Sequence, residues 1–270
     1  MLRLESAWLH LHQFDELATL HTPIHRRHAS AKILVTFALL VLTASFPPYA
    51  FSAMLPLLLY PLLLLRLGRI PFSPVLKRLA LALPFLLCLG LFNPLLDHTP
   101  LLVFGSWQVS GGWLSFFSLL LRSGLAVSAA LLLLATTGLP ALCHALLAWH
   151  VPRPLLVQFL LLHRYSYVLL EEMLRTLRAY QLRSNGSAAL QRSVWGSLPG
   201  HLLLRSHQRA KRIYQAMLCR GFDGSLPLPS AAPFTWLDAL YVAAWGTFFL
   251  FVRCYDLPHA LVTLFLGGRL

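Results

Sequence analysis

Long runs of apolar residues fill the first half of the chain and return near its end. They predict five membrane-spanning helices, at 33–46, 50–65, 79–96, 113–138 and 236–252. The first two runs are shorter than the roughly 20 residues that a helix needs to cross a bilayer, and Pro47-Pro48 separates them. We therefore expect a helical hairpin there, with arms that extend into flanking residues. The predicted fold class is all-α, a polytopic membrane bundle.

The pattern changes at Leu139, beyond which apolar residues recur with helical spacing and arginine becomes frequent. We expect a short helix at 140–149 and longer amphipathic helices on either side of Asn185-Gly186-Ser187, the second at about 201–220. The first should have an apolar face through Met173 or Leu174 and Leu177, with Glu171 and Arg175 paired beside it. The second should have only a thin apolar stripe, which includes Ile213 and Met217. The segment 155–170 carries glutamine, histidine and arginine, which suit an interfacial or cytoplasmic helix better than a span. If this segment does cross the bilayer, the number of spans rises from five to six.

Charge predicts the orientation of the chain. Lysine and arginine cluster at 66–78, whereas the loop 97–112 contains neither. Because basic loops stay on the cytoplasmic side, the loop should face outward and the basic region 164–220 should lie inside, which favours five spans. The predicted organisation is a cytoplasmic N-terminal approach (1–32), four transmembrane helices (33–138), long cytoplasmic coupling helices (139–235), and a last transmembrane helix with a tail (236–270).

Composition supports a membrane protein and excludes a nucleic-acid-binding domain. The 270 residues are 57% hydrophobic and 11% charged, against about 25% charged residues in a soluble domain. The net charge of +13 comes from residues scattered between apolar runs rather than from one basic domain. It therefore fits contact with the lipid bilayer and its anionic headgroups. The four cysteines have no metal-binding or disulfide spacing.

The sequence lacks the motifs of the common membrane-associated enzymes. An ATP-binding loop needs a lysine after a glycine, and none of Lys32, Lys77 and Lys211 follows one. The chain has no H-E-x-x-H, no G-x-S-x-G and no pair of carboxylates within a span. We therefore expect no catalytic residue, no cofactor and no enzymatic activity of its own.

Histidines and one arginine offer an alternative function. Five histidines precede Ala29, and imidazole suits cobalt, nickel and zinc. Arg122 lies inside the fourth span, where a charge normally faces protein or water. A metal path could use both, although the histidine spacing matches no known ligand pattern and the prediction assigns no metal ligand. Arg122 is equally compatible with a buried contact to a neighbouring helix or to a partner subunit. The histidines are His10, His12, His21, His25 and His28.

Two related sequences end the predicted cytoplasmic helices. Each has an alanine, three other residues, an arginine and then a small residue, and the two arginines lie 37 positions apart (220 minus 183). Alanine and arginine four residues apart share one face of a helix. Arginine in a last turn suits the helix dipole, and its planar guanidinium can grip carboxylates or carbonyls of a partner. Each end taken singly also fits an ordinary solvated helix terminus. The residues are Ala179, Arg183 and Ser184, and Ala216, Arg220 and Gly221.

With these residues in view, nearly the whole chain resembles the transmembrane T component of energy-coupling-factor transporters, in the cobalt branch called CbiQ. The most specific part of the likeness is Ala216-Met-Leu-Cys-Arg-Gly-Phe-Asp-Gly224. The other parts are the basic segment 23–32, Val151-Pro152-Arg153, Arg164-Tyr165 and Glu171-Glu172. The resemblance implies that Arg183 and Arg220 are coupling arginines that dock on a pair of ATPase subunits. Ser184 stands where the family usually has glycine.

The resemblance also implies a function and its partners. The chain would be the coupling subunit of an ATP-driven importer of cobalt or nickel in the bacterial inner membrane. ATP hydrolysis would belong to the ATPase pair, and substrate binding to a separate membrane S component. A stand-alone metal permease that uses the N-terminal histidines is the alternative, and a membrane enzyme is a third hypothesis without a supporting pocket.

Overall fold

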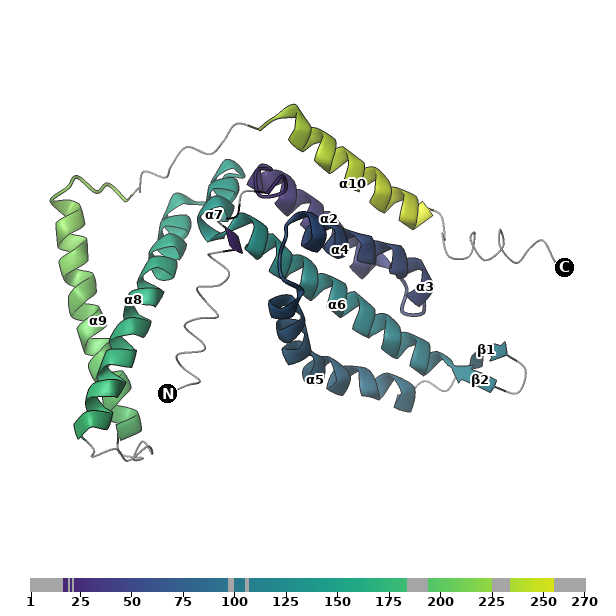
Figure 1. The fold of residues 1–270 in the computed structure, drawn as a ribbon, viewed down its shortest axis with the longest axis horizontal. Coiled ribbons are helices and arrows are strands. Elements are labelled where there is room, and N and C mark those ends of the chain that lie inside the picture. The colour runs from purple at the N-terminus through teal and green to yellow at the C-terminus, as the bar shows by residue number, and fades with distance from the viewer. Residues whose placement is uncertain are drawn as a thin grey trace. The chain divides into compact units, whose positions relative to one another are not determined.

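The computed structural model describes residues 17–18, 20, 22–96, 100–104, 107–183, 194–224 and 234–254. The chain divides into two compact units, which we describe separately (Figure 1). The bundle unit comprises residues 16–138 and 232–270, and the hairpin unit comprises residues 1–15 and 139–231.

The described part of the bundle unit is built around helix α6, Gly111–Thr137. Helices α2, α3, α4 and α5 all pack against α6, and α10 packs on α2 and α3. Leu125, Ala129 and Leu132 of α6 are fully buried and follow one face of the helix. The other elements are α2 (Ala29–Ser45), α3 (Phe51–Met54), the short 3-10 helix η1 (Leu55–Leu58), α4 (Leu59–Leu67), α5 (Phe72–Leu96) and α10 (Trp236–Cys254).

These elements confirm the predicted helical membrane bundle. Each of the five apolar runs is helical, and three helices are long and apolar enough to span a bilayer: Phe72–Pro94, Gly111–Thr137 and Trp236–Cys254. The helices Ala29–Ser45 and Phe51–Leu67 are apolar but shorter. On α5, Leu81 and Phe85 are 79% and 68% exposed. Large apolar side chains exposed along such a helix are expected to face lipid.

Two boundaries in the bundle unit differ from the sequence predictions. Helix α5 begins at Phe72 rather than at residue 79, because Pro74 falls in its first turn, where proline is tolerated. The segment 97–112, expected to be a loop, contains an antiparallel pair of strands. These are β1, Pro100–Phe104, and β2, Trp107–Ser110, with Phe104 opposite Trp107.

One buried lysine ties the end of α6 to α2. The side chain of Lys32 is 3% exposed, and its Nζ donates to the carbonyl oxygen of Thr136 at 2.8 Å and to that of His25 at 3.3 Å. The last carbonyls of a helix have no partner within the helix, so the ammonium group satisfies one of them. Gly138 follows with a φ of 70° and ends α6 in the left-handed region, as glycine commonly does.

Arg122 has a comparable role at the other end of α2. Its Nη2 donates to the carbonyl oxygen of Phe46 at 2.7 Å and to that of Pro47 at 3.5 Å. The guanidinium of Arg253 lies 5.0 Å from the centre of the Phe46 ring. The last carbonyls of a helix have no partner within the helix, and Arg122 supplies a donor to the carbonyl of Phe46, the C-cap residue of α2.

The hairpin unit contains α7 (Leu139–Ala148), α8 (Arg153–Arg183) and α9 (Val194–Leu218). The segment 155–170 is not a separate helix, because α8 continues for 31 residues to Arg183. Among the described helices, α8 and α9 are not candidate spans. Helix α9 begins at Val194 rather than at residue 201, with Pro199 inside it. One groove is lined by the end of α8 and the start of α9, and another by the first half of α8 and the end of α9. The two helices are therefore antiparallel.

The packing faces of the hairpin follow the predicted patterns. On α8, Leu174 and Leu177 are each 7% exposed and lie on the predicted apolar face, while Arg175 and Arg178 are exposed. On α9, Ile213 and Met217 of the predicted stripe are only half-buried. No side chain within the described range 196–218 is buried, which confirms that the α9 stripe is thin.

Candidate functional site

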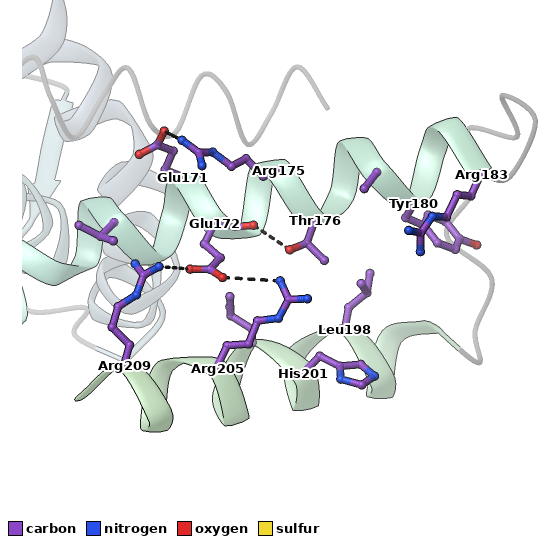
Figure 2. Close-up of a pocket in the computed structure, with 13 residues that line it drawn as sticks. Glu171, Glu172, Arg175, Thr176, Tyr180, Arg183, Leu198, His201, Arg205 and Arg209 are labelled. Atoms are coloured by element: carbon purple, nitrogen blue, oxygen red, sulfur yellow. Dashed lines mark hydrogen bonds and ion pairs between the residues drawn. The ribbon is translucent and has the colours of Figure 1, made fainter. Parts of the chain in front are cut away.

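The first candidate arginine is the last residue of α8. The Arg183 side chain is exposed and borders a groove of about 740 Å³ between α8 and α9. Ala179, one turn earlier, borders the same groove, as do Leu198 and His201 of α9 (Figure 2). Ala179 and Arg183, which we expected to share one face of a helix, thus both line this groove. Ser184 lies outside the described residues.

The second candidate arginine stands where the backbone leaves α9. The N–H of Phe222 donates to the Met217 carbonyl at 3.0 Å, and the N–H of Gly221 donates to the Leu218 carbonyl at 3.0 Å. Together these two bonds form a Schellman motif, with Gly221 at a φ of 79° in the left-handed position. Arg220 is therefore the C-cap residue. Its exposed guanidinium is carried on a backbone of fixed geometry.

The structure brings the Arg220 end beside the first half of α8. A second groove, of about 730 Å³, is bordered by Ala216, Arg220 and Gly221 on one side. His163, Arg164 and Tyr165 of α8 border it on the other side. Residues from distant parts of the sequence that carry the CbiQ resemblance therefore line one groove. This proximity depends on how the hairpin folds, and the sequence pattern alone did not predict it.

The two arginines occupy opposite ends of the hairpin. Arg183 ends α8, whereas Arg220 borders the same groove as Arg164 of α8. Arg183 lies 19 positions after Arg164 (183 minus 164), which corresponds to about 28 Å along the α8 axis at 1.5 Å per residue. The hairpin therefore offers two separate cationic positions rather than a single binding pocket.

A charge cluster that sequence analysis missed joins the two helices. Glu172 of α8 lies 2.9 Å from Nη2 of Arg209 and 3.6 Å from Nη1 of Arg205, both on α9 (Figure 2). The predicted pair of Glu171 and Arg175 is confirmed, with 2.6 Å between the carboxylate and Nη2, and it stays within α8. A signal for the missed cluster exists, since α9 has four basic residues at 205–212 and no acidic residue. A carboxylate that pairs with these basic residues must therefore come from another helix.

His25 and His28, the described histidines of the N-terminal segment, have structural contacts. His28 caps α2, because its Nδ1 accepts from the N–H of Ser30 at 3.2 Å. Nδ1 of His25 lies 2.6 Å from Oγ1 of Thr22. Within the described ranges, no group of three or more histidine, cysteine or acidic residues is placed to hold a metal ion. His10, His12 and His21 lie outside those ranges.

Comparison with protein families decides the classification. The profile of the CbiQ family, described as a cobalt transport protein, matches residues 21–230. The chain belongs to the CbiQ family. It is thus a multi-pass membrane protein of a transport family, and the matched region includes the hairpin helices and both candidate arginines.

A curated relative outside the cobalt description supports the same family. The chain is 31% identical over 153 residues to the nickel permease LarQ of Lactiplantibacillus plantarum. The match covers 50% of this chain and 55% of that protein, so it spans about half the length of the curated relative. The family is thus described by cobalt transport, and this relative by nickel.

Proposed function

We propose that this CbiQ-family chain is the transmembrane coupling subunit, or T component, of an ATP-driven importer of cobalt or nickel. Its position would be the bacterial inner membrane, with the bundle unit in the bilayer and the hairpin unit in the cytoplasm. A pair of ATPase subunits would hydrolyse ATP, and a separate membrane S component would bind the metal.

The observation that carries this proposal is the pair of exposed arginines at the C-terminal ends of α8 and α9. Both belong to helices that are not candidate spans, while the bundle unit holds helices that are. Two positions about 28 Å apart along α8 suit two copies of one partner better than a single small ligand. Arginine at a helix terminus can form paired hydrogen bonds with carboxylates or carbonyls in a partner groove.

The helical construction of the hairpin supports transmission of motion. Closure of an ATPase pair moves its two binding grooves together, and long helices attached to those grooves convert the closure into a rotation. Helix α8 is continuous over 31 residues, so it can act as a rigid arm. The bundle unit would pass this rotation to the S component and open its metal site to the cytoplasm.

The test is co-purification of partners from native membranes in mild detergent, with copurifying chains identified by mass. In a variant with Arg183→Glu and Arg220→Glu, we expect the chain to remain folded and to lose the ATPase subunits. The matched control is Arg178→Glu with Arg212→Glu, which makes the same change in net charge at exposed positions away from the helix ends. Equal recovery of ATPase subunits in both variants contradicts the proposal.

A stand-alone permease is the second candidate function. It is favoured by the name of the relative, nickel permease, and it would use the N-terminal histidines with Arg122. The discriminating measurement is metal uptake by lipid vesicles that contain this chain and no other protein. Uptake of cobalt or nickel in such vesicles, without ATP, supports the permease. Uptake that requires ATPase subunits and an S component supports the coupling subunit.

A further inference from the structure

Helices α8 and α9 are held together with little apolar packing. Three grooves, of about 740, 730 and 600 Å³, lie between them along the hairpin. The third is mainly apolar, and Leu162 and Leu203 beside it are 66% and 69% exposed. With no buried side chain within the described residues 196–218 of α9, hydrophobic burial contributes little to fixing the angle between these helices.

Among the described residues of α8 and α9, one contact that bridges the gap is ionic. Glu172 is 20% exposed at its side chain, and each of its two carboxylate oxygens faces one arginine of α9. Arg205 and Arg209 are four residues apart, so both project from the same face of α9 toward Glu172 (Figure 2). A partly sheltered carboxylate with two guanidinium partners is less screened and more directional than an isolated surface pair.

The position of this cluster relative to the helix ends is symmetric. Glu172 precedes Arg183 by 11 residues (183 minus 172), and Arg209 precedes Arg220 by 11 residues (220 minus 209). At 1.5 Å per residue each distance is about 16 Å along its helix. Because α8 and α9 are antiparallel, the two arginine-bearing ends extend from the cluster in opposite directions.

We propose that the cluster of Glu172, Arg205 and Arg209 is the pivot of the α8–α9 hairpin and fixes the separation of Arg183 and Arg220. Glu172 is a positioning residue in this role, since it touches neither arginine-bearing end. The consequence for transport rests on the proposed function. With the pivot in place, movement of one ATPase-bound end turns the whole α8–α9 hairpin instead of bending one helix away from the other.

The chain offers well-placed reporters for this geometry. Leu182 is 86% exposed beside Arg183, and Cys219 is an exposed free cysteine beside Arg220. With Leu182→Cys, and with Cys88, Cys143 and Cys254 replaced by alanine, spin labels at 182 and 219 report the separation of the two ends. The full chain is measured in lipid nanodiscs by pulsed electron paramagnetic resonance, so no ATPase subunit is required.

The matched control variant is the neighbouring glutamate. Glu171→Gln removes the same charge, but its carboxylate pairs with Arg175 on its own helix. We expect Glu172→Gln to broaden and shift the distance distribution, while Glu171→Gln leaves it as in the parent chain. The exchange Glu172→Arg with Arg209→Glu restores the narrow distribution. Identical distributions in the Glu172→Gln and Glu171→Gln chains overturn the pivot.

Two further readouts separate the pivot from a loss of folding and from a failure of the proposed function. Raising the salt concentration should broaden the distribution of the parent chain and leave that of Glu172→Gln unchanged, since only the parent has a cluster to screen. In the assembled transporter, Glu172→Gln should retain the ATPase subunits and lower metal uptake per ATP hydrolysed. If the spin-label result holds but no ATPase subunit is ever captured, the pivot stands and the coupling role fails.

Discussion

The carboxylate of Asp238 accepts a hydrogen bond from the backbone N–H of His28, 210 residues away in sequence, at 3.1 Å. Its second oxygen accepts from the N–H of Thr235 at 3.0 Å, while the N–H of Asp238 donates back to the Thr235 carbonyl at 2.8 Å. One buried acid, 4% exposed, therefore caps the first turn of α10 and the first turn of α2 together. It fixes two helix starts of the bundle unit in one place.

Asp238→Ala should destabilise the bundle unit by about 2 kcal/mol or more, because two backbone donors lose a charged acceptor. The measurement is thermal unfolding of the purified chain in detergent. Asp238→Asn retains one acceptor oxygen, so its melting temperature should lie between those of the parent chain and Asp238→Ala. Glu171→Ala, at an exposed position, serves as the control. An unchanged melting temperature in Asp238→Ala would show that the caps contribute nothing measurable.

Lys32→Met should cost roughly 1–3 kcal/mol, the price of a buried carbonyl without a hydrogen-bond donor. Methionine has a similar length and fills the space, so cavity formation is not the cause. The affected groups are the Thr136 carbonyl at the end of α6 and, at a longer distance, the His25 carbonyl. Thermal unfolding again provides the measurement. Stability equal to or above that of the parent chain would mean that burial of the ammonium group outweighs its hydrogen bonds.

Arg122→Met should destabilise the bundle by several kcal/mol, since carbonyls of the α2 end would lack partners inside the bilayer. Arg122→Lys should recover part of the loss by supplying a single cationic donor. Unfolding in mixed micelles of increasing denaturing detergent measures both variants. If metal uptake by the assembled transporter falls while stability is unchanged, Arg122 contributes to the transport path instead of the fold.

Gly221→Val should weaken capture of the ATPase subunits, because a β-branched residue strains the left-handed conformation that ends α9. No atom lies within 4 Å of a Cβ added at Gly221, so steric crowding within the chain is excluded as the cause. Gly221→Asn adds a side chain that tolerates this conformation and should capture the ATPases nearly as well as the parent. Equal loss in both variants would point to a partner surface that excludes any side chain.

What the sequence could predict about this fold is largely local. The apolar runs, the pair of Glu171 with Arg175, and glycine at the end of α9 depend on residues within a few positions of one another. Helical spacing and capping rules are sufficient for such features. The early start of α5 was not predicted, because the apolar run that marks the span begins only at residue 79, although Pro74 is permitted in a first turn.

The long-range contacts could not be predicted in the same way. Glu172 and Arg209 are 37 residues apart (209 minus 172), and Arg122 and Phe46 are 76 residues apart. Each pairing depends on which helix faces lie together, and a single sequence does not specify that. The excess of positive charge on α9 indicated that an acidic partner was needed, but not which acid. The candidate arginines were identified from motif and resemblance, and their separation along the hairpin came only from the fold.

The central claim is that Arg183 and Arg220 each dock on an ATPase subunit, and cross-linking from the adjacent positions tests it most directly. A photoactivatable cross-linker is attached either to Cys219 or to Leu182→Cys, with the other cysteines replaced, and native membranes are irradiated before mass identification. The coupling account predicts that both positions cross-link to an ATP-binding protein. If neither position cross-links to one, while the same membranes still take up metal, the account is contradicted.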